Sequence, residues 1–109
     1  MPVELAPGVK VLFTSPLSGS AAGTWARKLP MGSITILAGD RESLPQWRSL
    51  YAEWDNILAS PGGREDIPWA DGRFDLIIDA QPGQPSREML RVLAPGGSIA
   101  GLQDLADAL

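Results

Sequence analysis

The sequence predicts an α/β fold, an open parallel sheet of about five strands with helices on both faces. Short apolar runs rich in β-branched residues recur along the chain, as they do in strands that are buried on both faces. Segments with apolar residues at helical spacing separate these runs, and they are long enough to carry the chain from one parallel strand to the next. Right-handed crossovers then leave few arrangements of the strands.

A single domain over residues 1–109 is expected, because this length supports one core and neither a repeat nor a linker divides the chain. The formal net charge is −4 and no basic stripe is present, which argues against a nucleic-acid partner. The chain contains no cysteine and no histidine. Disulfides, thiolate nucleophiles and most zinc and iron sites are therefore excluded, and carboxylates remain for metal binding or acid–base chemistry.

No apolar run approaches the length of a membrane span, so no membrane partner is expected. A secretory signal would require a charged segment and an apolar stretch near the N-terminus, and no such segment precedes Val3. A cytoplasmic location is therefore the expectation.

Two strand–helix pairs and a short third strand are expected in the first part of the chain. Apolar, β-branched runs mark the strands, at residues 9–14, 33–38 and 56–59. Apolar residues at helical spacing mark the helices, at residues 21–29 and 44–54. Pro30 and Gly32 end the first helix. Ser43 is expected to cap the second helix, and Pro45 falls in its first turn, where a missing N–H costs nothing.

The second part of the chain predicts a strand–helix–strand unit. Residues 74–79 form a buried strand. An apolar stripe at helical spacing follows, at Met89, Leu90, Val92 and Leu93. Pro95-Gly96-Gly97 is expected to stop this helix, because proline cannot continue the backbone ladder and glycine accepts the left-handed cap. The next strand is expected over residues 98–102, and a helical fragment over residues 103–109.

Two segments of this unit carry motifs, Asp66-Ile67-Pro68-Trp69-Ala70-Asp71-Gly72-Arg73-Phe74-Asp75-Leu76 and Leu93-Ala94-Pro95-Gly96-Gly97. Together they resemble the segments that lead into the fourth and fifth strands of class I S-adenosylmethionine-dependent methyltransferases. The resemblance covers roughly a third of the chain. It implies a Rossmann-like parallel sheet in the order 3-2-1-4-5. The closing antiparallel strands of the family are not expected, because they do not fit after Leu102. These motifs specify the fold, since none of their residues performs chemistry in the family.

In such sheets the ligand crevice lies beyond the carboxyl ends of the strands. The resemblance implies an acidic residue and a Gly-x-Gly-x-Gly turn in the first loop, where a cofactor approaches the backbone closely. This chain has Phe13 in place of the acid, Pro16 and Leu17 within the turn, and Gly19 as the one glycine that is kept. The first loop therefore departs from the pattern of the family.

A shifted register through residues 18–23 recovers small residues, including Ser20 and Gly23 beside Gly19. Serine hydroxyls and N–H groups at a helix N-terminus could hold an anion there. The alternative is a Gly/Ser turn that simply lets the strand meet its helix.

Five further residues fall at family positions near the crevice. Asp40 follows the second strand, where the family's acid accepts hydrogen bonds from ribose hydroxyls, although an aspartate favoured by a helix dipole explains it equally well. In the third loop the adenine-contacting acid falls at Gly63, which cannot supply it, with Arg64 next and Asp66 beside the pocket. Asp79, after the fourth strand, is the best-placed carboxylate for contact with a substrate.

The remaining aromatic and acidic candidates have structural interpretations. The four tryptophans, Trp25, Trp47, Trp54 and Trp69, are expected in the core or over the sheet, and two of them exposed together would mark a contact surface. Trp69 could instead stack on an adenine ring. Asp75 begins its strand far from the crevice and is expected to be structural.

Two functions follow. The favoured one is a degenerate, non-catalytic methyltransferase-like domain that acts as an interaction or accessory module, with no bound cofactor and no catalytic or metal-binding residue. The alternative is an active minimal methyltransferase that binds S-adenosylmethionine and works mainly by proximity. A nucleotide or another anion at residues 18–23 is a third possibility. An uncovered edge of the fifth strand predicts a protein partner or a homodimer.

Overall fold

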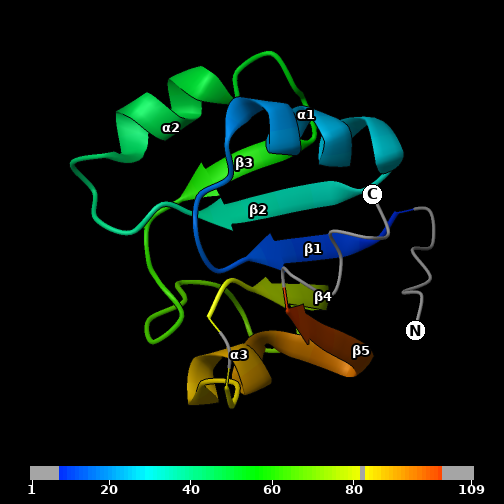
Figure 1. Cartoon of the computed structure of the whole chain (residues 1–109). Coiled ribbons are helices and arrows are strands. Elements are labelled where there is room, and N and C mark those ends of the chain that lie inside the picture. The colour runs from blue at the N-terminus through cyan, green and yellow to red at the C-terminus, as the bar shows by residue number, and fades with distance from the viewer. Residues whose placement is uncertain (1–7, 82, 102–109) are drawn as a thin grey trace.

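A five-stranded parallel sheet forms the centre of the computed structural model, which describes residues 8–81 and 83–101 (Figure 1). Its strands are β1 (Lys10–Phe13), β2 (Ser33–Leu37), β3 (Ile57–Ser60), β4 (Phe74–Asp79) and β5 (Leu93–Gly101). They lie in the order β3-β2-β1-β4-β5, and every neighbouring pair is parallel. The expected fold class and strand order are confirmed.

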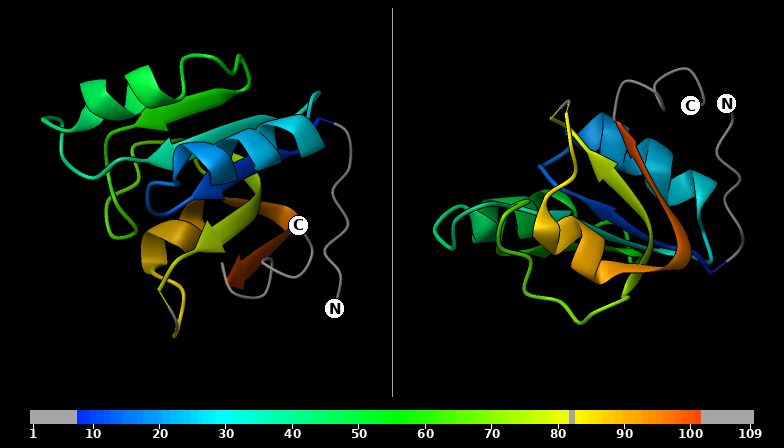
Figure 2. Two further views of the ribbon diagram at one scale, coloured as in Figure 1. Left: turned by 45° about the horizontal axis from the view of Figure 1, so that its top comes forward. Right: turned by 90° about the horizontal axis from the view of Figure 1, so that it is seen from below.

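Three helices cover the two faces of this sheet, α1 (Gly19–Lys28), α2 (Leu44–Leu50) and α3 (Arg87–Val92). Helices α1 and α2 lie on one face and α3 lies on the other (Figures 1 and 2). Between β3 and β4 the chain runs without a helix. The two helical layers therefore cover the sheet unequally, two helices against one.

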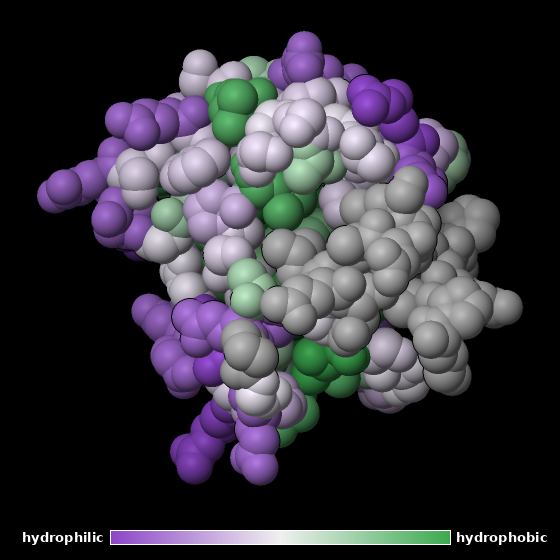
Figure 3. Space-filling view, viewed as in Figure 1, coloured by the Kyte–Doolittle hydropathy of each residue, from purple (hydrophilic) through white to green (hydrophobic). Residues whose placement is uncertain are grey.

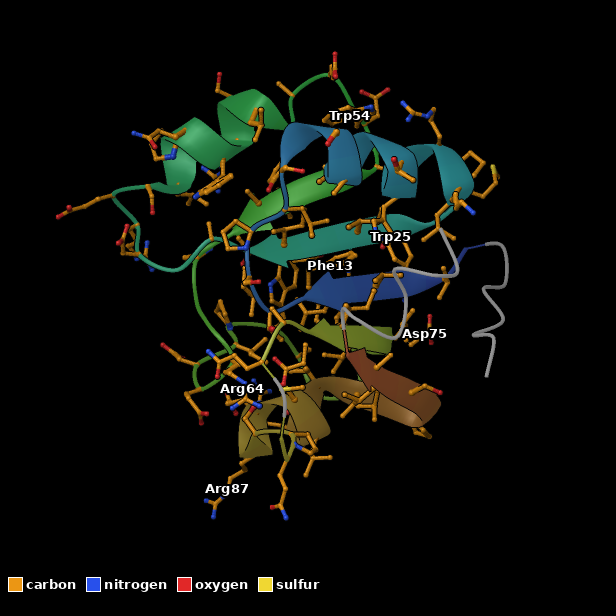
Figure 4. All side chains as sticks on the ribbon, viewed as in Figure 1. Phe13, Trp25, Trp54, Arg64, Asp75 and Arg87 are labelled. Atoms are coloured by element: carbon orange, nitrogen blue, oxygen red, sulfur yellow. The ribbon has the colours of Figure 1, made fainter. Side chains whose placement is uncertain are left out.

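The core is divided between the two faces because successive strand residues point to opposite sides. In β1, Val11 and Phe13 join the cluster under α1 and α2, whereas Leu12 joins the cluster under α3. Phe13 meets the buried Trp25 edge to face, with ring centroids 5.2 Å apart (Figure 4). The position of the family's first-loop acid is thus a core position in this chain.

Helix α2 is shorter than the sequence predicts. It ends at Leu50, and Tyr51 closes it by donating its N–H to the carbonyl groups of Ser49 and Trp47. The expectation of a helix to residue 54 is wrong because the last turn tightens at Tyr51, and Trp54 then donates its N–H to Tyr51 O.

The Pro95-Gly96-Gly97 segment does not end α3, as the sequence analysis expected. Helix α3 stops at Val92, and β5 begins at the next residue. The register against β4 shifts within β5, since Leu93 pairs with Phe74 and Ser98 with Leu76. Prolines and glycines fit such irregular strand positions, where ladder bonds are interrupted. Residues 1–7, 82 and 102–109, including the helical fragment expected over 103–109, lie outside the described residues.

Candidate functional site

The loops after β1, β3 and β4 meet at the carboxyl edge of the sheet, around the buried carboxylate of Asp79 at the end of β4. The Thr14 hydroxyl, directly after β1, donates to Asp79 Oδ1 at 2.9 Å and accepts from the Ala80 N–H. The Gln81 N–H also donates to Asp79 Oδ1, at 3.2 Å. Asp79 is therefore held from both adjacent central strands.

Arg64 reaches the same carboxylate from the loop after β3. Its Nη2 lies 2.8 Å from Asp79 Oδ2 and 2.9 Å from Gln84 O, and its Nη1 lies 3.1 Å from Glu65 Oε1. The side chains of Arg64 and Asp79 are 17% and 6% exposed, so this ion pair is largely shielded from water. Arg64 lies below the carboxyl end of β4, near α3 (Figure 4). The structure thus brings together two residues that the sequence analysis named separately.

The pKa of Asp79 follows from these contacts. Burial raises it, because a carboxylate loses water. The hydrogen bonds from Arg64, from the Gln81 N–H and from the Thr14 hydroxyl outweigh burial and hold the pKa below its usual range. Asp79 is consequently an ionised, fully engaged acceptor.

The loop between β1 and α1 is fixed by a tyrosine from another part of the chain. The Tyr51 hydroxyl accepts a hydrogen bond from the Leu17 N–H at 3.0 Å and donates one to the Leu17 carbonyl at 2.6 Å. Leu17 and Tyr51 are both buried in the cluster under α1 and α2. The Leu17 side chain thus packs inward, and it is the Leu17 backbone that is withheld from a ligand.

The glycines and the serine of the shifted register belong to the first part of α1. Ser18 caps the helix by accepting from the Ala21 N–H, so Gly19 and Ser20 already stand in its first turn. A Cβ on Gly23 would lie 2.8 Å from the Trp54 ring. The shifted register through residues 18–23 thus falls on the N-terminus of α1, and its use as an anion site stays a prediction.

These small residues form one wall of an open hollow of about 400 Å³. The opposite wall is the segment from the end of α2 to Trp54. The lining residues are Gly19, Ser20, Gly23, Thr24, Arg27, Leu50, Glu53 and Trp54. Hydrophobic atoms reach the surface at this hollow (Figure 3), where Leu50 is 42% exposed. The hollow lies in the layer formed by α1 and α2, away from the Asp79 cluster.

Asp40 stands exposed just after β2, and it organises the start of α2. Its Oδ1 accepts from the Ser43 hydroxyl at 2.7 Å and from the Ser43 N–H at 2.8 Å. These bonds hold the pKa of Asp40 below its usual range. Ser43 makes no capping bond with its side chain, so the expectation that it caps α2 is wrong; its hydroxyl is already donated to Asp40.

The remaining third-loop candidates form a tight turn. The Gly63 N–H donates to Asp66 O and the Asp66 N–H donates to Gly63 O, and the Asp66 side chain is exposed. Trp69 packs edge to face on Phe74 and donates its Nε1–H to Ser60 Oγ at 3.0 Å. It lies with the cluster under α3, in agreement with the packing interpretation.

Thr14 and Tyr51 are the polar site residues that the sequence analysis did not name. Thr14 could have been found, because a hydroxyl directly after a central strand points toward the crevice. Tyr51 gave no such signal. It stands in the apolar stripe of its helix, and its partner Leu17 is 34 residues away in sequence.

The residues present fit an S-adenosylmethionine site only in part. Asp40 is an exposed acid after β2, as the resemblance requires. The first loop does not fit, since the Leu17 N–H is bonded and Pro16 has no N–H to offer. Across residues 8–81 and 83–101, no three acidic side chains gather where they could hold a metal ion. None of the three described helices has the length and hydropathy that crossing a bilayer requires.

Comparison with known proteins agrees with this fold. No protein-family model matches the chain. The chain is 32% identical over 114 residues to the ubiquinone/menaquinone biosynthesis C-methyltransferase UbiE of Geotalea daltonii, covering 93% of this chain and 48% of that protein. The structure of the present chain superposes on that of a putative sarcosine dimethylglycine methyltransferase from Galdieria sulphuraria with a TM-score of 0.69 at 25% identity. This match covers 87% of this chain and 39% of that one.

The chain is a class I S-adenosylmethionine-dependent methyltransferase-like domain. The same fold occurs in the cyclase SpnF, with a TM-score of 0.71 at 24% identity, covering 87% of this chain and 38% of that one. A likeness of this kind shows the fold alone. This methyltransferase-like domain spans about half the length of the curated relative that it matches.

Proposed function

We propose that this methyltransferase-like domain is degenerate and non-catalytic, and that it acts as an interaction or accessory module. The supporting observation is that the polar groups around the crevice are satisfied within the chain itself. The backbone N–H and carbonyl of Leu17 are bonded to Tyr51, and the Asp79 carboxylate is bonded to Arg64, Thr14 and Gln81. A sulfonium nucleotide would have to displace these bonds without an open N–H at Pro16 to replace them.

The second candidate is an active methyltransferase. Asp40 favours it, because this carboxylate is exposed and ionised directly after β2 and could accept hydrogen bonds from two ribose hydroxyls. The similarity to UbiE, a C-methyltransferase by name, also supports it. In that case catalysis would depend on positioning a nucleophile against the methyl group, since the chain has no histidine or cysteine to act as a base.

Calorimetric titration of the protein with S-adenosylmethionine and S-adenosylhomocysteine separates the two candidates. The non-catalytic proposal expects no binding heat at ligand concentrations up to about 1 mM. Micromolar binding that Asp40→Ala abolishes and Asp55→Ala leaves unchanged would overturn the preference for a domain without a cofactor and favour the active alternative. Asp55 is a suitable control, because it is another exposed aspartate, placed beyond α2.

We further propose that the module meets its partner, another protein or a second copy of the chain, through β5. Within residues 8–81 and 83–101, β5 pairs with β4 and with no other strand. The unpaired side of such a strand offers N–H and carbonyl groups to an incoming strand. Light scattering and hydrogen exchange test this. A monomer whose β5 amides are all protected would contradict it, whereas protection that appears only with a dimer or an added partner would support it.

A further inference from the structure

The Tyr51 hydroxyl bonds to both the N–H and the carbonyl of Leu17 in the first loop. Tyr51 closes α2, and its ring is 2% exposed and stacked against Trp47, with centroids 6.0 Å apart. Its hydroxyl reaches across the core cluster to the N–H and the carbonyl of Leu17. The end of α2 and the loop between β1 and α1 are thereby joined through a single oxygen atom.

This hydroxyl is a well-placed donor and acceptor at neutral pH. Burial raises the pKa of the Tyr51 phenol, and although the hydrogen bond with Leu17 lowers it, the pKa stays above its ordinary value. The phenol therefore keeps its proton and donates a hydrogen bond to the Leu17 carbonyl. Without the hydroxyl, both backbone groups of Leu17 would be buried without a partner, and the loop would have to move to bring them to water.

We propose that Tyr51 is a positioning residue that latches the first loop in a closed form and so determines whether the crevice accepts an adenine nucleoside such as S-adenosylhomocysteine. The inference rests on the proposed function, since it names the contact that keeps the loop closed. It does not depend on the β5 edge. The latch acts through the backbone of Leu17, whose N–H and carbonyl are both bonded to the Tyr51 hydroxyl, in the loop that follows the carboxyl end of β1.

The experiment compares Tyr51→Phe with the wild type and with Trp47→Phe, which removes the stacked indole but keeps the hydroxyl. Two quantities are measured, the exchange rate of the Leu17 amide by NMR and the affinity for S-adenosylhomocysteine by calorimetry. Loss of the latch is expected to speed Leu17 exchange by about tenfold or more in Tyr51→Phe. It is also expected to produce binding heat with S-adenosylhomocysteine at about 1 mM, where the wild type is expected to give none. Trp47→Phe is expected to change neither quantity by that amount.

Two results would overturn the latch. One is unchanged Leu17 exchange in Tyr51→Phe, and the other is faster exchange with no gain in affinity. If the wild type itself binds S-adenosylhomocysteine tightly, the proposed function fails, but the latch is still judged on the ratio between variant and wild type.

A measurement on the wild type covers the case in which Tyr51→Phe does not fold. Tyr51 is the chain's only tyrosine, so its hydroxyl proton can be assigned without ambiguity. We expect a slowly exchanging hydroxyl resonance with a nuclear Overhauser contact to the Leu17 amide. A hydroxyl that exchanges freely with water would refute the latch without any variant.

Discussion

The ion pair between Arg64 and Asp79 places two charges where water is scarce, so its contribution depends on how completely each charge is bonded. Asp79 accepts from Arg64, Thr14 and Gln81, and Arg64 donates in addition to Gln84 O. Such a pair adds little compared with an apolar replacement, but removing one member leaves the other charge buried alone. The asymmetry makes single substitutions here more damaging than paired ones.

Replacing Arg64 by methionine is expected to lower the free energy of unfolding by about 2 kcal/mol, since Thr14 and Gln81 still bond to the orphaned carboxylate. Urea denaturation of the variant measures this. Arg87→Met, an exposed position on α3, serves as the control and should change stability by less than about 0.5 kcal/mol. The double variant Arg64→Met with Asp79→Asn should recover part of the loss. An Arg64→Met variant as stable as wild type would contradict this account.

The same pair predicts how the loss depends on pH. Because folding lowers the pKa of Asp79, its ionisation stabilises the native state above the unfolded value of about 4, and this contribution disappears as the pH falls through the folded value. The stability gap between wild type and Arg64→Met should therefore be full at pH 7 and should narrow in acid, as the pH falls toward the lowered folded pKa of Asp79. Denaturation series at several pH values check the sign, and a gap that widens in acid would show that another group dominates.

At the scale of single elements, β5 contains a glycine, Gly97, at the point where its register against β4 shifts. Its register against β4 shifts between Leu93 and Ser98, and the intervening residues must turn back close to the β4 backbone. A Cβ on Gly97 would lie 2.8 Å from Asp75 O and 2.9 Å from Ala94 O, both of them backbone atoms that cannot easily move. Asp75 is itself tied to β1, since its Oδ2 accepts from the Lys10 N–H at 3.0 Å.

Gly97→Ala is accordingly expected to destabilise the domain by about 2 kcal/mol, because the added methyl group forces β5 away from β4. Gly63→Ala is a matched control, since nothing lies within 4 Å of a Cβ at that glycine. The control should stay within about 0.5 kcal/mol of the wild type. Thermal unfolding of the two variants side by side decides the matter. Equal stabilities would mean that β5 adjusts freely at this point.

At the scale of the whole molecule, the sheet places β1 between β2 and β4, whereas β3 and β5 form the margins. The amides of Val11 and Phe13 should therefore exchange only by global unfolding, and those of β3 should exchange through smaller openings. Hydrogen exchange across a denaturant series tests this order. Slower exchange in β3 than in β1 would show that the marginal strand is held by contacts other than its ladder.

The sequence predicted the strands and the helical layers because these depend on repeated apolar patterns, which many residues define together. The strand order was implied by the resemblance to class I methyltransferases. The sequence misplaced the end of α2, because the last turn tightens locally at Tyr51, and the start of β5, because β5 pairs with β4 through a shifted register. Among the site residues, Arg64 and Asp79 were named, but their pairing was not, since nothing along the chain indicates that a loop 15 residues earlier folds back to β4. The Tyr51 contact escaped for the same reason.

The central place of β1 has a consequence during synthesis on the ribosome. One of its neighbours, β2, follows within a few tens of residues, but the other, β4, ends only at Asp79. Until that strand has left the exit tunnel, the central strand of the sheet keeps one side unpaired. The nascent chain therefore leaves one side of β1 open to chaperones until β4 has emerged.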